Sequence, residues 1–156
     1  SNQAASTSKN EGDYYREYEM QYLVDYMVND ASYNDNDLWL LGGDTNSFSR
    51  KDSWFYPSST KATKYLPHDV VINNTNMKDV IADRVPANHF MPTTSGGDRI
   101  DIMYASPAMF NRIEHSTTLI DAWASTLPEH YAATWSGQKF RDPSDHRPLL
   151  IDFNMQ

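Results

Sequence analysis

The stretch Leu38-Trp39-Leu40-Leu41-Gly42-Gly43-Asp44-Thr45-Asn46 organises the interpretation of the whole sequence. Its apolar first half predicts a buried β-strand, because a short apolar run bounded by turn-forming residues is typical of a strand inside a sheet. The glycine pair lets the backbone turn sharply where the strand ends. Asp44 and Asn46 are two residues apart, so they project to the same side of an extended backbone. Such an end suits a cation or a phosphate, although the stretch taken alone is better explained by an Asx-rich turn.

The composition limits the classes of function. The chain of 156 residues has the length of one domain, and its formal net charge of −8 disfavours a broad basic surface for long nucleic acid. This charge does not exclude a metal enzyme that acts on phosphate esters, because bound cations reverse the local field. The absence of cysteine excludes disulfides and thiolate metal sites. No apolar run reaches transmembrane length, and the Asn- and Tyr-rich, Lys-poor composition favours an exported protein.

The N-terminal part predicts a tail followed by one long helix. Residues 1–12 are polar and are expected to be a disordered tail. From Asp13 to Asn29, aromatic and aliphatic residues recur three or four positions apart, which predicts a helix with Asp13 as its N-cap. One face of this helix is aromatic and is expected to pack in the core; it consists of Tyr15, Tyr18, Tyr22 and Tyr26.

The rest of the chain predicts alternating loops and short elements. Aromatic residues gather in the loop 47–67, where Trp54-Phe55-Tyr56-Pro57 is a candidate specificity element or simply a packed surface loop. A second loop is expected over residues 127–142. The expected elements are a short helix at Met77–Arg84 and strands at Asp98–Tyr104, Ile113–Trp123 and Leu149–Phe153.

Polar clusters stand at the ends of three expected strands. They are Asp44 with Asn46, Arg99 with Asp101, and Asp145 with His146. Each alone has a structural explanation, namely an Asx turn, a cross-strand ion pair and a turn before a strand. Together they supply the parts for metal-assisted phosphoryl chemistry: carboxylates bind Mg²⁺, an amide holds a phosphate oxygen or water, and a histidine serves as acid, base or phosphate contact.

These clusters carry a resemblance to a known family. Gly43-Asp44-Thr45-Asn46, Arg99-Ile100-Asp101 and Ser144-Asp145-His146-Arg147-Pro148 resemble the last three motifs of the endonuclease/exonuclease/phosphatase (DNase I-like) superfamily of divalent-metal phosphoesterases. The family pattern is Gly-Asp-x-Asn, Arg-Ile-Asp and Ser-Asp-His-x-Pro, in that order. Thr45 stands where the family usually has an aromatic residue.

The resemblance implies a role for each matching residue. Asp44 orients or activates the attacking water, and Asn46 binds the phosphate or that water. Asp101 hydrogen-bonds the imidazole of His146, which contacts the scissile phosphate and stabilises its developing charge. Asp145 helps to bind the metal. The substrate contacts are therefore expected from Asn46 and His146.

The resemblance also implies an α/β (α+β) fold that is part of a four-layer αββα sandwich, with one mostly antiparallel or mixed sheet and flanking helices. The family's earlier motifs, including its principal metal-binding glutamate, have no counterpart in residues 1–38. Residues 1–156 are therefore expected to form a single domain equivalent to the C-terminal half of the family's domain, with Arg99 in a structural role. The expected cofactor is Mg²⁺ or Mn²⁺, with its principal carboxylate ligand outside this chain.

Two hypotheses of function follow from these expectations. The first is a divalent-metal-dependent phosphoesterase or phosphodiesterase acting on a small phosphate ester, with this chain carrying the His/Asp half of the site and inactive alone. Because one face of its sheet would lack cover, the chain is expected to bind the missing N-terminal half or to self-associate. The alternative is a non-catalytic binding module that holds a partner or glycan with the loops Trp54–Pro57 and Tyr131–Trp135. Intact motif residues favour the enzyme.

Overall fold

The computed structural model describes residues 11–86, 89–94, 96–118, 133–135, 138–140 and 146–156. Its helices and strands alternate along the chain with short 3₁₀ and π-helical turns. In chain order the elements are α1 (Glu11–Asp25), a π-helical turn (Tyr26–Asp30), β1 (Leu40–Asp44), two 3₁₀ turns (Arg50–Asp52 and Ala62–Tyr65), α2 (Leu66–Asn74), β2 (Lys78–Asp79), β3 (Asp101–Ala105), α3 (Pro107–Phe110), β4 (Ile113–Thr118), β5 (Ala133–Trp135), β6 (Gln138–Phe140) and β7 (Leu149–Phe153).

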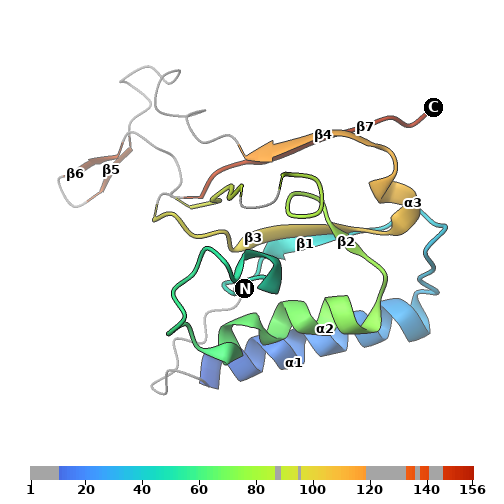
Figure 1. Cartoon of the computed structure of the whole chain (residues 1–156), viewed down its shortest axis with the longest axis horizontal. Helices are drawn as coiled ribbons and strands as arrows, with labels where there is room; N and C mark the ends of the chain where they lie inside the picture. The colour runs from blue at the N-terminus through green and yellow to red at the C-terminus, as the bar shows by residue number, and fades with distance from the viewer. Residues whose placement is uncertain (1–10, 87–88, 95, 119–132, 136–137, 141–145) are drawn as a thin grey trace.

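Helices and strands stack in layers, as Figure 1 shows. Helices α1 and α2 cover one face of a three-stranded antiparallel sheet with the order β1-β3-β2, and the antiparallel pair β4-β7 lies over the other face. Strands β5 and β6 form a separate antiparallel hairpin. The α+β class and the antiparallel pairing are thus confirmed, although the described strands are divided among separate sheets.

Central strand β3 separates two hydrophobic clusters by the alternation of its side chains. Ile102 and Tyr104 are almost fully buried on the side of α1 and α2. Met103 and Ala105 point the other way and pack with residues of β4 and β7. Because side chains alternate along a strand, Asp101 belongs to the face of Met103 and Ala105. This face also receives the chain just before β7, where His146 lies.

The tyrosine face of α1 is exposed, so the prediction that it packs in the core is wrong. The helix instead buries Val24, and the π-helical turn that follows buries Met27. The periodicity shows that the helix has distinct faces, but it does not decide which face turns inward. Aliphatic side chains need no buried hydrogen-bond partner, whereas a buried tyrosine hydroxyl does. Between 54% and 73% of the surface stays exposed in Tyr15, Tyr18, Tyr22 and Tyr26.

Helix α1 begins at Glu11, two residues before the predicted N-cap, so residues 11–12 are helical and do not belong to a tail. Asp13 lies inside the first turn and is buried. Its carboxylate accepts a hydrogen bond from the Thr63 hydroxyl at 2.8 Å and forms an ion pair with Lys64 at 3.2 Å. Asp13 therefore ties the start of α1 to the 3₁₀ turn that precedes α2.

Strand β1 includes the glycines and Asp44, whereas the sequence predicts a strand over residues 38–41 and a turn at the glycines. Gly42 faces Met103 across the sheet, and a Cβ at this position would come within 3.0 Å of the Ile102 backbone oxygen. Glycine therefore permits the close approach of β1 to β3. Among the described strands β1 lies at the edge, and Leu40 is 42% exposed, so the prediction of a buried strand is wrong here.

Two further differences concern α2 and the segment 77–84. The sequence pattern does not predict α2 because Pro67 resembles a helix breaker, yet proline is favourable in the first turn of a helix. Segment 77–84 forms β2 and a turn, and the predicted helix is absent from it. The Asp79 carboxylate accepts hydrogen bonds from the backbone N–H groups of Ile81 and Ala82, each at 2.9 Å. Local side-chain acceptors of this kind compete with helix formation.

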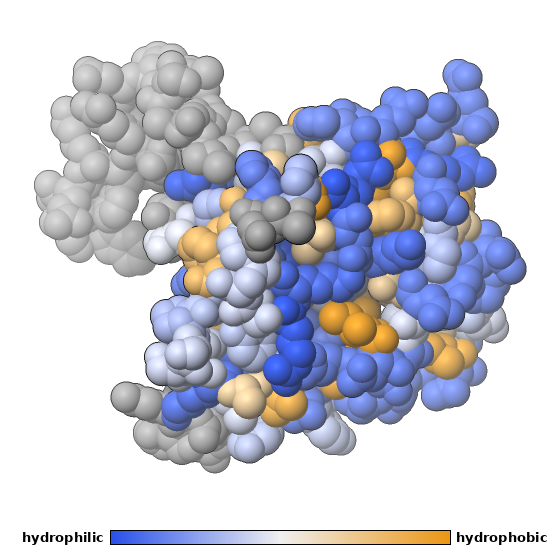
Figure 2. Space-filling model, viewed as in Figure 1, coloured by the Kyte–Doolittle hydropathy of each residue, from blue (hydrophilic) through white to orange (hydrophobic). Residues whose placement is uncertain are grey.

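The remaining strand predictions are confirmed as β3, β4 and β7, with the part of the second strand after residue 118 outside the described residues. The predicted loop 127–142 contains β5 and β6. On the face seen in Figure 2, hydrophobic residues form separate small patches among hydrophilic ones. None of the described helices has the length and apolar character needed to cross a bilayer.

Candidate active site

The sheet brings two of the predicted carboxylates together. Asp44 ends β1 and Asp101 begins β3, and the antiparallel register makes them direct partners. Asp44 is exposed and Asp101 is partly buried. Like charges directly opposite each other in a sheet repel, so this arrangement favours a bound cation or a proton donor between them.

Asn46 is held against Asp44 by two hydrogen bonds. Its backbone N–H donates to Oδ1 of Asp44 at 2.9 Å, and its Nδ2 donates to Oδ2 at 3.1 Å. The backbone of Asn46 is left-handed, with φ of 45°, a conformation that asparagine tolerates better than most residues. Both oxygens of Asp44 keep a second lone pair, so the clamp orients the carboxylate without exhausting it as an acceptor.

His146 lies beside Asp101 in the predicted arrangement. Its Nδ1 is 2.8 Å from Oδ2 and 3.0 Å from Oδ1 of Asp101. An ionised carboxylate only accepts hydrogen bonds, so Nδ1 is the donor and carries a proton. Asp101 thereby fixes both the tautomer and the orientation of the imidazole, which is about two-thirds buried at 33% side-chain exposure.

A short segment before β3 attaches His146 to the sheet. Thr94 and His146 form an antiparallel bridge, and the backbone N–H of Arg147 donates to the Thr93 carbonyl at 2.7 Å. The buried hydroxyl of Thr93 accepts hydrogen bonds from the backbone N–H groups of Ile100 and Asp101, each at 3.0 Å. Thr93 therefore positions the start of β3 and the histidine together. The sequence contains no local signal for this role, because both partners are distant in sequence.

The donor set suits a hard divalent cation. Asp44, Asp101 and His146 each offer a ligand atom, and these atoms lie within 4.8 Å of one another. Oxygen donors are the ligands that Mg²⁺ prefers, and Mn²⁺ also accepts imidazole nitrogen. Among the described residues, Asp44 forms no ion pair with a cationic side chain. Because Nδ1 of His146 faces Asp101, Asp44 is the described group best placed to reach a cation directly or through water.

Arg99 has a different environment from Asp101, although only one residue separates them. The guanidinium is 1% exposed and forms ion pairs with Asp52 at 2.6 Å and Asp79 at 2.7 Å. Two of its nitrogens bind both oxygens of Asp79, in the bidentate geometry typical of strong pairs. The ion pair between Arg99 and Asp101 that the sequence allows is therefore not formed. We call Arg99, Asp52 and Asp79 the buried ionic cluster.

In the buried ionic cluster, burial and the neighbouring opposite charges shift the pKa values in opposite directions. Burial raises the pKa of the Asp52 carboxyl, although Arg99 pulls it down. For Asp79, burial also disfavours the charged form, but Arg99 and the two N–H donors outweigh it and the pKa lies below its ordinary value. Burial disfavours the charged guanidinium as well, yet the two carboxylates raise the pKa of Arg99. Arg99 thus compensates the burial of Asp79 fully and that of Asp52 only in part.

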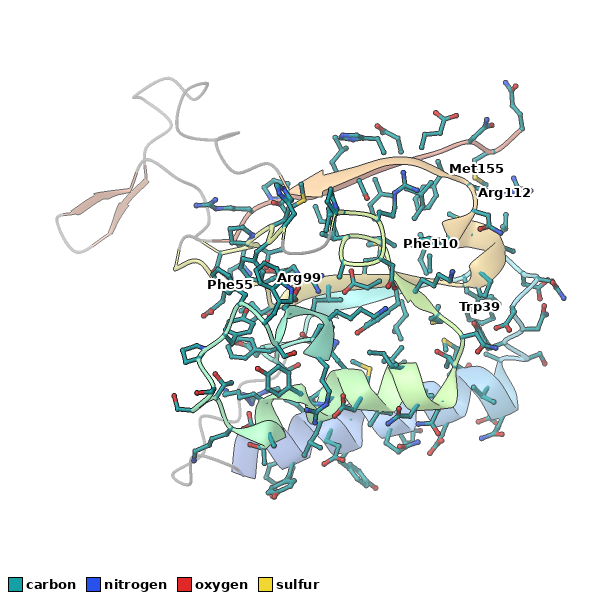
Figure 3. The ribbon with its side chains drawn as sticks, in the orientation of Figure 1. Trp39, Phe55, Arg99, Phe110, Arg112 and Met155 are labelled. Carbon is teal, nitrogen blue, oxygen red and sulfur yellow. The ribbon has the colours of Figure 1, made fainter. Side chains whose placement is uncertain are left out.

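The aromatic loop after Asn46 is partly packed and partly exposed. Tyr56 is buried, and its hydroxyl accepts a hydrogen bond from the Arg99 backbone N–H at 3.1 Å. Trp54 and Phe55 remain 46% and 48% exposed, and Phe55 stacks on Phe90 with ring centroids 3.7 Å apart. Figure 3 shows Phe55 and Arg99 at the same end of the molecule. In the loop Tyr131–Trp135, residues 131–132 lie outside the described residues and 133–135 form β5.

The structure therefore brings together Asp44, Asn46, Asp101 and His146 from segments distant in sequence, while the predicted metal ligand Asp145 lies outside the described residues. The sequence interpretation missed the supporting threonines 45, 93 and 94. Thr45 was signalled only by its departure from the family pattern, and it proves to be buried and hydrogen-bonded.

Comparisons with known proteins agree with this geometry at the level of the fold. No protein-family model matches the sequence, and no curated protein matches it either. Among solved structures, the chain is similar to an AP endonuclease from Archaeoglobus fulgidus, with a TM-score of 0.63 and 15% sequence identity. That enzyme has a DNase I-like fold. The match covers 93% of this chain and 56% of the endonuclease, so the chain spans about half the length of that structure.

Proposed function

We propose that this chain carries the His/Asp half of the active site of a divalent-metal-dependent phosphoesterase or phosphodiesterase. The observation that carries the proposal is the convergence of Asp44, Asp101 and His146, whose ligand atoms lie within 4.8 Å of one another, with Asn46 clamped to Asp44. These residues come from motifs spread between positions 44 and 146 of the chain, and they meet at one sheet end. Similarity to an AP endonuclease fold supports the same reaction class.

Each residue has a role that its contacts support. Asp44 accepts a proton from, or orients, the attacking water. Asn46 holds the phosphate or that water, and its position follows from the two hydrogen bonds to Asp44. Asp101 keeps the proton on Nδ1 of His146, which leaves Nε2 as the imidazole atom directed to the phosphate. With a proton on Nε2 as well, the imidazolium donates from Nε2 to the phosphoryl oxygens and stabilises the negative charge that develops there.

A divalent cation would bind beside Asp44, with Asp145 as a further ligand and the principal carboxylate supplied from outside this chain. When bound, Mg²⁺ or Mn²⁺ polarises the phosphoryl oxygens and lowers the pKa of a coordinated water. Completion of the site would come from the missing half of the domain or from self-association through the exposed edge of β1. Leu38 and Leu40 at the β1 edge are 45% and 42% exposed, which supports an additional partner there.

The substrate class follows from charge. The similar structure is an endonuclease, but the net charge of −8 here gives no support to a long nucleic-acid footprint. We therefore propose a compact phosphate ester, such as a small phosphodiester, a phospholipid headgroup or a sugar phosphate. The composition that favours an exported protein is compatible with such a substrate.

A Mn²⁺ titration followed by electron paramagnetic resonance tests the binding half of the proposal. We expect this chain to bind Mn²⁺ and Asp44→Asn to weaken the binding by at least about tenfold, because a carboxylate ligand or its water contact is lost. The matched control is Asp152→Asn, which neutralises a carboxylate that is 58% exposed on β7 and should leave the affinity unchanged. Equal loss in both variants, or no binding by the unchanged chain, would contradict the proposal.

Hydrolysis of bis-p-nitrophenyl phosphate tests the catalytic half. We expect no EDTA-sensitive activity from this chain alone, and activity from a longer protein that contains it together with the missing half of the domain. His146→Ala in that longer protein should abolish the activity. Hydrolysis by the 156-residue chain alone would show that no outside ligand is needed. Activity unaffected by His146→Ala would contradict the proposed role of this site, and a longer protein without activity would favour the alternative of a non-catalytic binding module.

A further inference from the structure

His68 lies outside the candidate active site but contacts the turn that forms it. The side chain is fully buried, at 0% exposure, in the first turns of α2. Its Nε2 is 2.9 Å from the Thr45 hydroxyl, and Thr45 lies between Asp44 and Asn46 in the chain. A single buried histidine therefore contacts the residue that joins Asp44 to Asn46.

The hydrogen bonds around His68 are compatible with one direction of donation. Oγ1 of Thr45 is 2.8 Å from the Ile100 carbonyl, which can only accept, and 3.4 Å from that of Ser47. The single hydroxyl proton therefore goes to Ile100, and Thr45 must accept from Nε2 of His68. This assignment makes His68 the neutral tautomer with its proton on Nε2.

The other ring nitrogen agrees with this tautomer. Nδ1 of His68 is 2.9 Å from the Tyr104 hydroxyl, and a bare Nδ1 accepts a hydrogen bond from that hydroxyl. A directed chain thus runs from Tyr104 through His68 and Thr45 to the Ile100 carbonyl, next to Asp101.

The turn at Asn46 needs such support because its backbone is sparsely populated. Asn46 has a φ of 45°, a conformation that few non-glycine residues adopt. Hydrogen bonds to Asp44 hold it on the exposed side. On the buried side its neighbour Thr45 is held by the Ile100 carbonyl, which accepts from the Thr45 N–H at 2.9 Å and from the Thr45 hydroxyl at 2.8 Å, and by His68, which donates to the same hydroxyl.

We propose that His68 is a positioning residue that, through Thr45, holds Asn46 and Asp44 in the geometry in which they bind ligand. This inference rests on the proposed function for the identity of the ligand but not for the geometry of the turn. Burial lowers the pKa of His68 to about 4, which agrees with a neutral ring. His68 touches no reacting group and acts only through the turn.

Two substitutions of His68 distinguish the role of Nε2 from that of Nδ1. His68→Gln places an amide N–H near the position of Nε2 and retains a donor to Thr45, whereas His68→Asn places its amide near Nδ1 and loses that donor. Both variants remove the ring and create a similar cavity, so a purely structural role predicts similar effects. We expect His68→Asn to speed amide hydrogen exchange at Asn46 and to weaken Mn²⁺ binding by about 10- to 100-fold, as losses behind a metal ligand do. His68→Gln should retain most of both properties.

The readouts distinguish failure of this inference from failure of the proposed function. Hydrogen exchange at Asn46, and the nitrogen chemical shifts that report a proton on Nε2 of His68, need no metal. Equal exchange in the two variants, or a proton on Nδ1, would overturn the positioning role even if Mn²⁺ binds. Absent Mn²⁺ binding with different exchange would overturn the proposed function alone. If the His68 variants do not fold, Thr45→Val and Thr45→Ser make the same comparison, because only serine retains the hydroxyl.

Discussion

Two clusters of carboxylates lie at the start of β3, and they have different roles. In the buried ionic cluster, Asp52 and Asp79 are matched by Arg99, and all three side chains are at most 7% exposed. In the candidate active site, Asp44 and Asp101 face each other with only His146 as a titratable partner among the described residues. The first cluster contains its own counter-charge, and the second does not.

This difference teaches where to look for a ligand. A buried charge requires a partner because desolvation is costly, so a compensated cluster such as that of Arg99 is explained by folding alone. Asp44 and Asp101 oppose each other directly, and their repulsion costs stability although they accept hydrogen bonds from Asn46 and His146. Folding therefore does not explain why Asp44 and Asp101 are adjacent, whereas a cation or phosphate chemistry does. Removal of a charge should consequently have opposite effects in the two places.

Loss of the buried guanidinium should produce the largest change in stability. We expect Arg99→Met to lower the free energy of unfolding by about 3–5 kcal/mol, because Asp52 and Asp79 would stay buried without their counter-charge. Urea unfolding followed by circular dichroism measures this. The matched control is Arg50→Met, whose guanidinium pairs with Asp69 at 2.7 Å but is 50% exposed. That pair should contribute at most about 1 kcal/mol. Equal effects would mean that burial does not distinguish the clusters.

Low pH should produce the second-largest change in the free energy of unfolding, through the protonation of His68. Its pKa is lowered by burial from 6.5 to about 4, with Asp79 raising it and Arg99 lowering it to a lesser extent. Above pH 6.5 the ring is neutral in both states, so stability is unaffected. As the pH falls from 6.5 towards 4, the unfolded chain binds a proton at His68 that the native state does not bind, so the free energy of unfolding decreases. The loss should reach about 3 kcal/mol near pH 4.

Unfolding in urea at several pH values between 7 and 4 checks this dependence, with His68→Gln as the control that lacks the titrating ring. The control should show a shallower loss over the same interval. Below pH 3.8 the lowered pKa of Asp79 adds a further loss in both proteins, because the native carboxylate then resists protonation that the unfolded one accepts. Parallel curves above pH 4 would contradict a neutral buried His68.

The sequence predicts the candidate site better than it predicts the layers around it. Asp44, Asn46, Asp101 and His146 follow or precede apolar strands, and polar residues at strand ends are recognisable one at a time. Their meeting depends on the register of β1 with β3 and on the bridge from Thr94 to His146. Such long-range pairings have no local signature. The family resemblance supplied the order of motifs, and the fold supplied the contact.

Packing explains the predictions that failed. The periodicity of α1 is correct, but the choice of the tyrosine face is wrong because Val24 and Met27 pack against α2, an element that Pro67 conceals in the sequence. Likewise, the apolar residues of segment 77–84 suggest a helix, but Asp79 accepts a hydrogen bond from Arg99, twenty residues later, and belongs to the buried ionic cluster. Both errors arise where a partner distant in sequence outweighs local preference.

The smallest expected effect provides the sharpest test of the comparison between the clusters. Asp44→Asn should change the free energy of unfolding by no more than about 0.5 kcal/mol, because Asp44 is exposed and pairs with no cationic side chain among the described residues. Relief of its repulsion with Asp101 should make any change stabilising. Asp79→Asn is the matched change in the buried ionic cluster and should destabilise the protein clearly, because the native state favours the charged form of Asp79 and Arg99 would lose its bidentate partner. Unfolding in metal-free urea measures both.

Addition of Mn²⁺ to the same experiment should make the unchanged chain more stable than Asp44→Asn. If the exposed cluster binds a cation, the unchanged chain gains stability with rising Mn²⁺ while Asp44→Asn gains less, because only the native state holds the assembled ligands. Asp79→Asn should keep the full gain above its lower starting value. A metal-free loss of stability in Asp44→Asn as large as that in Asp79→Asn would mean that Asp44 serves the fold. Asp44 would then stabilise the fold as the carboxylates of the buried ionic cluster do, and the proposed difference between the two clusters would be wrong.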